Sequence, residues 1–97
     1  MAKKIRWSVR AQNDRKEILK YWIFRNRSAI YSKKLNKAII LVVESISQYP
    51  SLGVLVNIKS VRFRVLKGYQ IFYQEKSDCI EIIAIWDSRR NPKKLNF

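Results

Sequence analysis

The sequence predicts an α+β fold, in which a pair of helices packs against an antiparallel sheet. Between residues 9 and 49 apolar residues recur at spacings of three and four, which is typical of helices. Between residues 61 and 86 they alternate with polar residues, which is typical of strands. Only two Gly and two Pro interrupt 97 residues, so most of the chain should be regular. At this length we expect one domain, spanning residues 1–97.

The first half of the chain predicts a strand and two helices. Residues 4–8 alternate polar and apolar side chains and suit a short strand. Ser8 can cap a first helix, which the apolar spacing places at about residues 9–25. A second helix ends at Tyr49-Pro50, because proline disfavours helical geometry in the residue before it. The short link at residues 26–28 makes the two helices an antiparallel hairpin.

The second half predicts three strands after a turn at residues 51–53. They are expected at residues 61–66, 69–74 and 79–86. Links of two to four residues are typical of an antiparallel meander. The predicted order is therefore strand, helix, helix, strand, strand, strand. The helices would cover one face of the sheet and leave the other to solvent.

The chain carries a large positive charge. Its net charge is +14, from 21 Lys and Arg against 7 Asp and Glu, and the excess is spread along the whole sequence. Such a density favours a negatively charged partner, namely nucleic acid, the ribosome or an acidic protein. The alternative is a basic surface that only keeps the protein in solution.

Several function classes lack their usual residues. The single Cys79 excludes an intrachain disulfide, and the absence of His removes the commonest general base and metal ligand. The seven acids are too scattered to predict a metal site, so we expect neither metal nor cofactor. We find no signal peptide and no apolar run near the ~20 residues of a membrane span. We therefore expect a cytoplasmic protein without membrane association.

The face of the sheet that is turned away from the helices is the candidate binding surface. In the strand at residues 61–66 we expect Val61, Phe63 and Val65 to pack under the helices. Arg62 and Arg64 would then face outward, since an unpaired arginine is costly to bury. Further basic and aromatic residues lie near the sheet: Tyr69, Tyr73, Trp86, Arg89 and Arg90.

Arginines beside flat rings suit RNA, because rings stack on bases and guanidinium groups bind phosphates. For each residue a structural role is the alternative. Outward arginines on a strand are commonly a solvated face, and aromatics are commonly core. Arg89 could pair with Asp87 and close a turn.

Short motifs follow one another along nearly the whole chain. They are Trp7-Ser8, Tyr21-Trp22, residues 49–53 (YPSLG), residues 68–73 (GYQIFY) and residues 85–92 (IWDSRRNP). In order and spacing they resemble the RelE/ParE superfamily of bacterial type II toxin–antitoxin toxins. The resemblance implies a small growth-inhibiting toxin of a plasmid-stabilization type, held inactive by a cognate acidic antitoxin. It also implies that the toxin–antitoxin complex binds its operator DNA.

RelE-like members cut ribosome-bound mRNA without metal, by attack of a 2′-hydroxyl on the scissile phosphate. Matching by motif, the resemblance places Arg62, Arg64 and Arg89 at the catalytic positions. The candidate substrate-binding residues are Lys67, Tyr69, Arg90, Lys93 and Lys94. Two positions depart from the RelE pattern: Gln70 stands where an Arg is expected, and residues 93–97 contain no Tyr or His. A general base would have to be Lys67, Lys93 or Lys94.

ParE-like members share the fold, lack the nuclease residues and poison DNA gyrase instead. The positive charge and the arginine face favour the mRNA endoribonuclease, which is the first hypothesis. Gln70 and the missing Tyr or His favour the gyrase poison, which is the alternative. A plain nucleic-acid-binding or ribosome-binding module is the third hypothesis, and whether the chain is an enzyme stays open.

Overall fold

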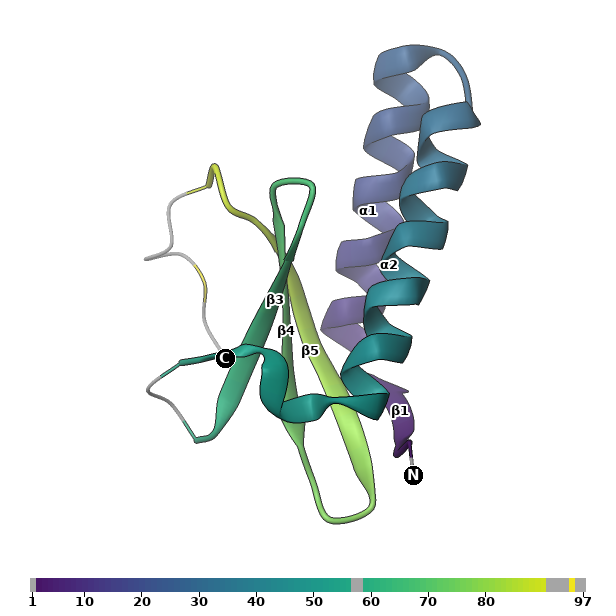
Figure 1. Ribbon diagram of the computed structural model, residues 1–97. Helices are drawn as coiled ribbons and strands as arrows, with labels where there is room; N and C mark the ends of the chain where they lie inside the picture. The colour runs from purple at the N-terminus through teal and green to yellow at the C-terminus, as the bar shows by residue number, and fades with distance from the viewer. Residues whose placement is uncertain (1, 57–58, 91–94, 96–97) are drawn as a thin grey trace.

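The computed structural model describes residues 2–56, 59–90 and 95, and its elements follow the predicted order (Figure 1). The elements are β1 (Lys4–Trp7), α1 (Val9–Asn26), α2 (Ile30–Gln48), a 3-10 turn η1 (Pro50–Leu52), β2 (Val54–Leu55), β3 (Val61–Leu66), β4 (Tyr69–Glu75) and β5 (Cys79–Asp87). The predicted α+β fold with a helical hairpin is confirmed. The short strand β2 and the turn η1 are additions to it.

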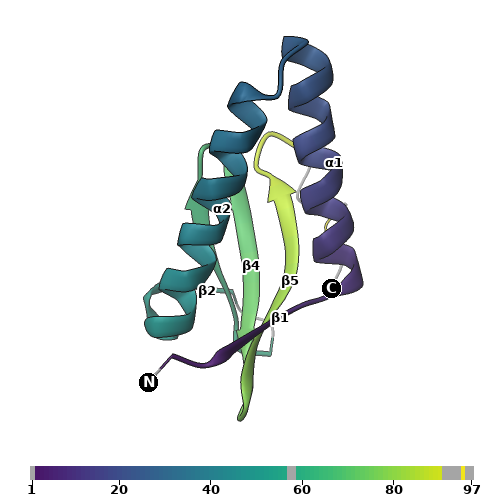
Figure 2. The ribbon, with the colours of Figure 1, turned by 90° about the vertical axis from the view of Figure 1, so that its right-hand side faces the viewer.

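The strands form one sheet in the order β1-β5-β4-β3-β2. β3, β4 and β5 are the predicted antiparallel meander. β1 pairs with β5 in the parallel direction, with Lys4 opposite Cys79 and Trp7 opposite Ile82. The first strand therefore lies beside the last, and both helices cross the same face of the sheet (Figure 2).

Ser8 joins the start of α1 to β5. Its hydroxyl accepts a hydrogen bond from the Ala11 amide at 2.9 Å and so caps α1. The same hydroxyl donates to the Ile83 carbonyl of β5 at 2.8 Å. Asp14, one turn after Ala11, accepts a hydrogen bond from the Ile85 amide at 3.0 Å. These bonds cover the edge of β5 where β1 has ended.

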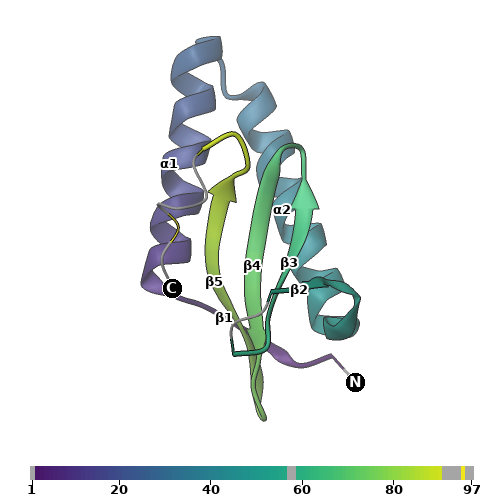
Figure 3. The ribbon, with the colours of Figure 1, turned by 90° about the vertical axis from the view of Figure 1, so that its left-hand side faces the viewer.

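The sheet has an apolar core on each face. The larger core lies under the helices and contains Leu35, Ile39, Ile46, Ile71, Tyr73, Ile80 and Ile82, all buried. The smaller core lies on the far face and contains Val61, Phe72 and Trp86, with Val56, Phe63, Ile83 and Leu95 packed against it. Figure 3 shows the sheet from this far side, with the helices behind the strands. The far face is therefore not the solvated face that the sequence predicted.

The predicted orientation of β3 is wrong. Arg62 lies opposite Tyr73 and Arg64 opposite Ile71, and both partners belong to the core under the helices. Val61 instead belongs to the far core. Residues directly opposite on paired strands share a face, so the arginines are on the helix-covered face. They are tolerated there because they lie at the border of α2 and η1, where they find hydrogen-bond acceptors.

Candidate functional site

Arg62 and Tyr73 hold the chain between α2 and β2. The Arg62 guanidinium donates to the carbonyls of Ser51 and Gly53, at 3.2 and 2.8 Å. The Tyr73 hydroxyl accepts from the Gly53 amide at 3.0 Å and donates to the Pro50 carbonyl. Burial raises the pKa of Tyr73 above its ordinary value, although the Gly53 hydrogen bond and the nearby arginines oppose the shift. Arg62 is thus part of a structural network.

Arg64 is attached to the second helix. It is half-buried, and its guanidinium donates to the Ser45 hydroxyl of α2 at 3.3 Å. Like Arg62, it links β3 to an element packed beside it. Neither arginine points away from the helices toward an open sheet face.

Arg89 is paired with Asp87. Its Nε and Nη2 donate to the two carboxylate oxygens at 2.9 and 2.8 Å, and its backbone amide donates to Oδ1 at 2.9 Å. The side-chain hydrogen bond from Arg89 lowers the pKa of Asp87 below its ordinary value. The pair closes the turn after β5, which is the structural alternative that the sequence left open.

The three arginines predicted as catalytic therefore have different partners in different places. Arg62 and Arg64 lie on β3 beside α2 and η1, whereas Arg89 follows β5. β4 separates these two strands. With adjacent strands about 4.8 Å apart, the backbones of β3 and β5 lie about 10 Å from each other. The structure does not bring the three guanidinium groups to one acceptor.

A cleft of about 460 Å³ lies between α1 and the end of β5. It brings together three residues that the sequence proposed for substrate binding or catalysis, namely Tyr69, Arg89 and Arg90. Three carboxylates share the cleft, those of Asp14, Glu17 and Asp87. The sequence analysis named Asp87 as a partner for Arg89 and missed the other two. Positive and negative groups are therefore mixed in this cleft, which is not the arrangement expected for gripping a phosphate.

The other predicted substrate-binding residues are dispersed. Tyr69 is only 5 % exposed, and its hydroxyl accepts a hydrogen bond from the Trp22 indole at 2.9 Å, so it is a core residue. The Lys67 ammonium lies 5.7 Å from the centre of the Tyr31 ring. Arg90 stacks on Trp86, with its guanidinium carbon 4.8 Å from the ring centre. Lys93 and Lys94 lie outside the described residues.

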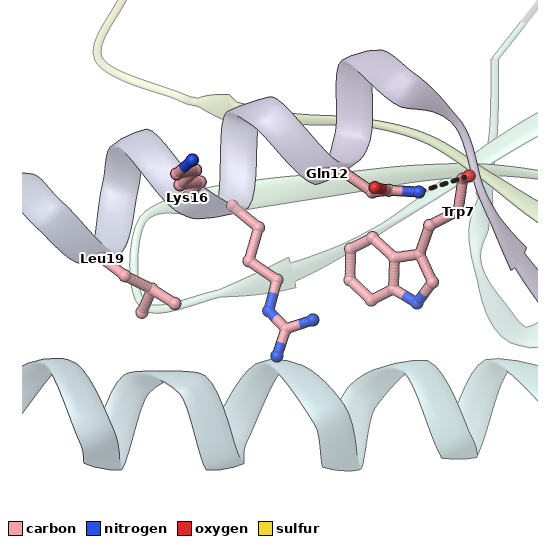
Figure 4. A pocket seen from close by; sticks show the side chains of 5 residues that line it. Trp7, Gln12, Lys16 and Leu19 are labelled. Atoms are coloured by element: carbon pink, nitrogen blue, oxygen red, sulfur yellow. Dashed lines mark hydrogen bonds between the residues drawn. The ribbon is translucent and has the colours of Figure 1, made fainter.

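A second depression lies on the outer side of the helices. It measures about 420 Å³ and is lined by Trp7, Gln12, Arg15, Lys16 and Leu19 (Figure 4). Arg15 reaches across from α1 and donates to the Asn36 amide oxygen of α2 at 2.8 Å. We call this depression, between α1 and α2, the hairpin groove. The sequence analysis missed it because it needs both helices in place.

Within residues 2–56, 59–90 and 95, no three His, Cys, Asp or Glu side chains gather into a group that could hold a metal ion. In the same residues, no helix is long and apolar enough to cross a membrane.

Comparison with known families assigns the chain to one of them. The sequence model described as "ParE toxin of type II toxin-antitoxin system, parDE" matches residues 5–92. The chain belongs to the ParE toxin family. The resemblance to the RelE/ParE superfamily is thereby confirmed, and the match covers every strand and helix described above except Lys4, the first residue of β1.

The fold of this ParE-family toxin also has a solved counterpart. A structure described as the chromosomal ParDE TA system from P. aeruginosa superposes with a TM-score of 0.76, covering 89 % of this chain and 96 % of that chain. The two sequences are 18 % identical, so the likeness concerns the fold. A search of curated proteins gives no match.

Proposed function

We propose that this ParE-family toxin stops growth by binding and poisoning DNA gyrase, without cutting mRNA. The proposal reverses the order of the two mechanisms that the sequence alone suggested. The observation that carries it is the placement of the arginines. A nuclease of the RelE type needs several positive groups around one scissile phosphate, whereas each of these three arginines binds an acceptor of its own protein.

The ParE family match supports the same mechanism, because ParE-like toxins act on gyrase. The departures at Gln70 and in residues 93–97 agree with it, since they remove residues that the nuclease would use. A toxin that only binds requires surface complementarity and no general base. The net charge of +14 then serves association with an acidic partner.

The proposal includes regulation by an antitoxin. We infer that a cognate acidic antitoxin neutralises the toxin in the cytoplasm and that the complex binds its own operator DNA. We also infer that residues 1–97 act as one toxin domain. The remaining candidate is ribosome-dependent mRNA cleavage, which the high positive charge favours.

Two assays on purified toxin separate these mechanisms. In the first, the toxin is added to gyrase with relaxed plasmid, and supercoiling and cleaved DNA are followed on gels. In the second, it is added to a translation extract, and cut sites in the message are mapped. We expect loss of supercoiling with intact message, and the same toxin mixed with its antitoxin is the control. Cut message with active gyrase would refute the proposal, and activity in neither assay would refute both mechanisms.

A further inference from the structure

The end of the helical hairpin carries charge of one sign. We call residues 20–37 the hairpin end, and this segment contains no Asp or Glu. Its six cations are Lys20, Arg25, Arg27, Lys33, Lys34 and Lys37. The stretch without an acid is longer still and runs from Ile18 to Val43. Because no carboxylate offsets these charges locally, the hairpin end is a strong source of positive potential.

The fold does not use these six cations. All six residues are exposed, and within the described part of the chain none of their side chains has a hydrogen bond or an ion pair. Ion pairs lie instead at the sheet and at the start of α1, on Lys3, Arg6, Arg10, Lys76 and Arg89. The charges of the hairpin end are therefore available to a partner.

The hairpin end projects from the rest of the molecule. It stands beyond the ends of β4 and β5 in both Figure 1 and Figure 2. α1 ends at Asn26 and α2 begins at Ile30, so a short turn holds the two helices side by side. The hairpin groove lies nearer to β1, and none of its lining residues belongs to the hairpin end. A large partner can thus reach these cations without contacting the sheet.

Exposed rings are mixed with the cations on α1. Phe24 is 86 % exposed and Tyr21 is 50 % exposed. Residues four apart share a face of a helix, so Lys20 lies on the side of Phe24, and Arg25 lies on the side of Tyr21. Each of these rings therefore has a cation on its own side of the helix.

This mixture favours one kind of negatively charged partner. A membrane surface binds helices whose apolar and cationic side chains lie on opposite faces, which this part of α1 does not offer. An acidic protein would need carboxylates placed to match cations on two helices. Duplex DNA presents a phosphate about every 3.4 Å along each strand, and the sugars between the phosphates can pack against exposed rings.

We propose that the hairpin end binds the backbone of duplex DNA. This inference rests on the proposed function, because gyrase acts on duplex DNA and a toxin bound to gyrase lies close to that DNA. The toxin would contact the enzyme through another surface and the DNA phosphates through the hairpin end. Such binding is independent of base sequence, since phosphate contacts carry no sequence information directly.

The salt dependence of DNA binding tests the number of phosphate contacts. Purified toxin is titrated onto a short fluorescent duplex, and anisotropy is measured between about 50 and 200 mM salt. Each neutralised phosphate contributes about −0.9 to the slope of log K against log salt, so six contacts give a slope of about −5. Affinity should then fall about 10³-fold over this range. A slope shallower than about −2 would overturn the proposal.

A matched pair of double variants locates the contact. Lys20→Gln with Lys34→Gln removes one cation from each helix of the hairpin end. Lys4→Gln with Lys59→Gln removes two exposed cations at the sheet, so both proteins lose the same charge. We expect the first pair to make the slope shallower by about 1.8 and to weaken binding at least about tenfold at low salt. The second pair should weaken it less than about threefold.

Equal losses in the two double variants would assign DNA binding to the charge of the whole molecule and would overturn the proposal. Circular dichroism checks that both variants are folded. The parent protein is also titrated with phosphatidylglycerol vesicles and with a single-stranded RNA as long as the duplex. Tighter binding to either of these than to the duplex would assign the hairpin end to that partner and overturn the inference.

Failure of the DNA proposal is distinguishable from failure of the gyrase proposal, because DNA binding is measured without gyrase. If Lys20→Gln with Lys34→Gln weakens DNA binding as expected but the parent protein spares gyrase, only the gyrase proposal fails. If the parent protein inhibits gyrase but the two double variants bind DNA equally well, only the DNA proposal fails.

Discussion

Both faces of the sheet carry an apolar core, but they differ in whether the polar atoms in and beside the core have hydrogen-bond partners. On the helix-covered face, Tyr73, Arg62 and Arg64 place their polar atoms on acceptors and donors at the border of the core. On the far face, the Trp86 indole Nε1 is buried and has no hydrogen-bond partner among the described residues. The helix-covered face is the larger core, and its polar groups are satisfied.

This difference in hydrogen bonding indicates which face of the sheet fixes the relative positions of the helices and strands. Hydrogen bonds on the helix-covered face connect β3 and β4 to α2 and to the chain that follows it, so they fix the position of one element against another. The far face is held by packing of a few rings and aliphatic side chains, such as Phe63 and Phe72 at 5.4 Å between ring centres. We therefore expect substitutions on the helix-covered face to cost more. Four predictions test this.

The largest difference is expected between two adjacent residues of β5. Ile82 is fully buried under the helices, whereas Ile83 is half-buried on the far face. Ile82→Ala should lower the free energy of unfolding by about 4 kcal/mol, and Ile83→Ala by about 1–2 kcal/mol, because a deeply buried site leaves the larger cavity. Urea denaturation measures both values. Equal losses would show that the far core is as important as the helix-covered one.

The next effect concerns the turn that Tyr73 holds. A Cβ at Gly53 would lie within 2.9 Å of the Tyr73 ring, so Gly53→Ala should cost about 2–3 kcal/mol through overpacking. Gly68 has open space around it but a φ of 84°, which asparagine also tolerates. Gly68→Asn should therefore cost less than about 1 kcal/mol. Thermal unfolding of both variants checks the order, and a harmless Gly53→Ala would contradict the role of the turn.

A smaller effect should separate two tryptophans. The Trp22 indole donates to the buried Tyr69 hydroxyl, whereas the Trp86 indole has no partner among the described residues. Trp22→Phe should cost about 1 kcal/mol more than Trp86→Phe, because only the first substitution removes a hydrogen bond. Denaturant titration of the two variants gives the difference. A larger cost for Trp86→Phe would mean that its indole does bind an acceptor.

The smallest effect is a dependence on alkaline pH. Burial raises the pKa of Tyr73 in the folded state, so the unfolded chain loses this proton more readily. The associated stability is fully present below pH 10 and should decrease as pH rises above 10. Tyr73→Phe should be less stable at pH 7 and should lack this part of the decrease. Unfolding curves between pH 8 and pH 11 make the comparison, and parallel profiles would refute it.

Much of the fold could be predicted because its signals are local. Ser8 and the apolar spacing place the start of α1 at Val9, and the alternation in β3 gives Val61–Leu66 as observed. β2 could not be predicted, because two residues are too short for a period. The face of β3 was also beyond the pattern. Alternation shows that Arg62 and Arg64 share one face of β3, but it does not show which face lies under the helices. We assumed that the arginines were on a solvated face, and this assumption was wrong.

The site was harder to predict than the fold. The Arg89–Asp87 pair was recognisable, since the residues are two apart in the chain. The partners of Arg62 and Arg64 were not, because they belong to α2 and to the turn after it. The hairpin groove also depends on two packed helices. Of the largely apolar run at residues 18–24, Leu19 alone lines the groove, so this run was not a signal for it.

The pairing of β1 with β5 affects how the toxin folds while the ribosome is still synthesising it. The bond between Arg6 and Glu81 spans 75 residues, so β1 has no neighbour in the sheet until β5 has been made. At about 5–20 residues per second, synthesis of that stretch takes about 4–15 s. During this time the first strand is exposed and the groove that includes Trp7 is incomplete. A nascent chain therefore passes through a period in which β1, α1 and α2 have been made but the strand that joins β1 to the sheet has not.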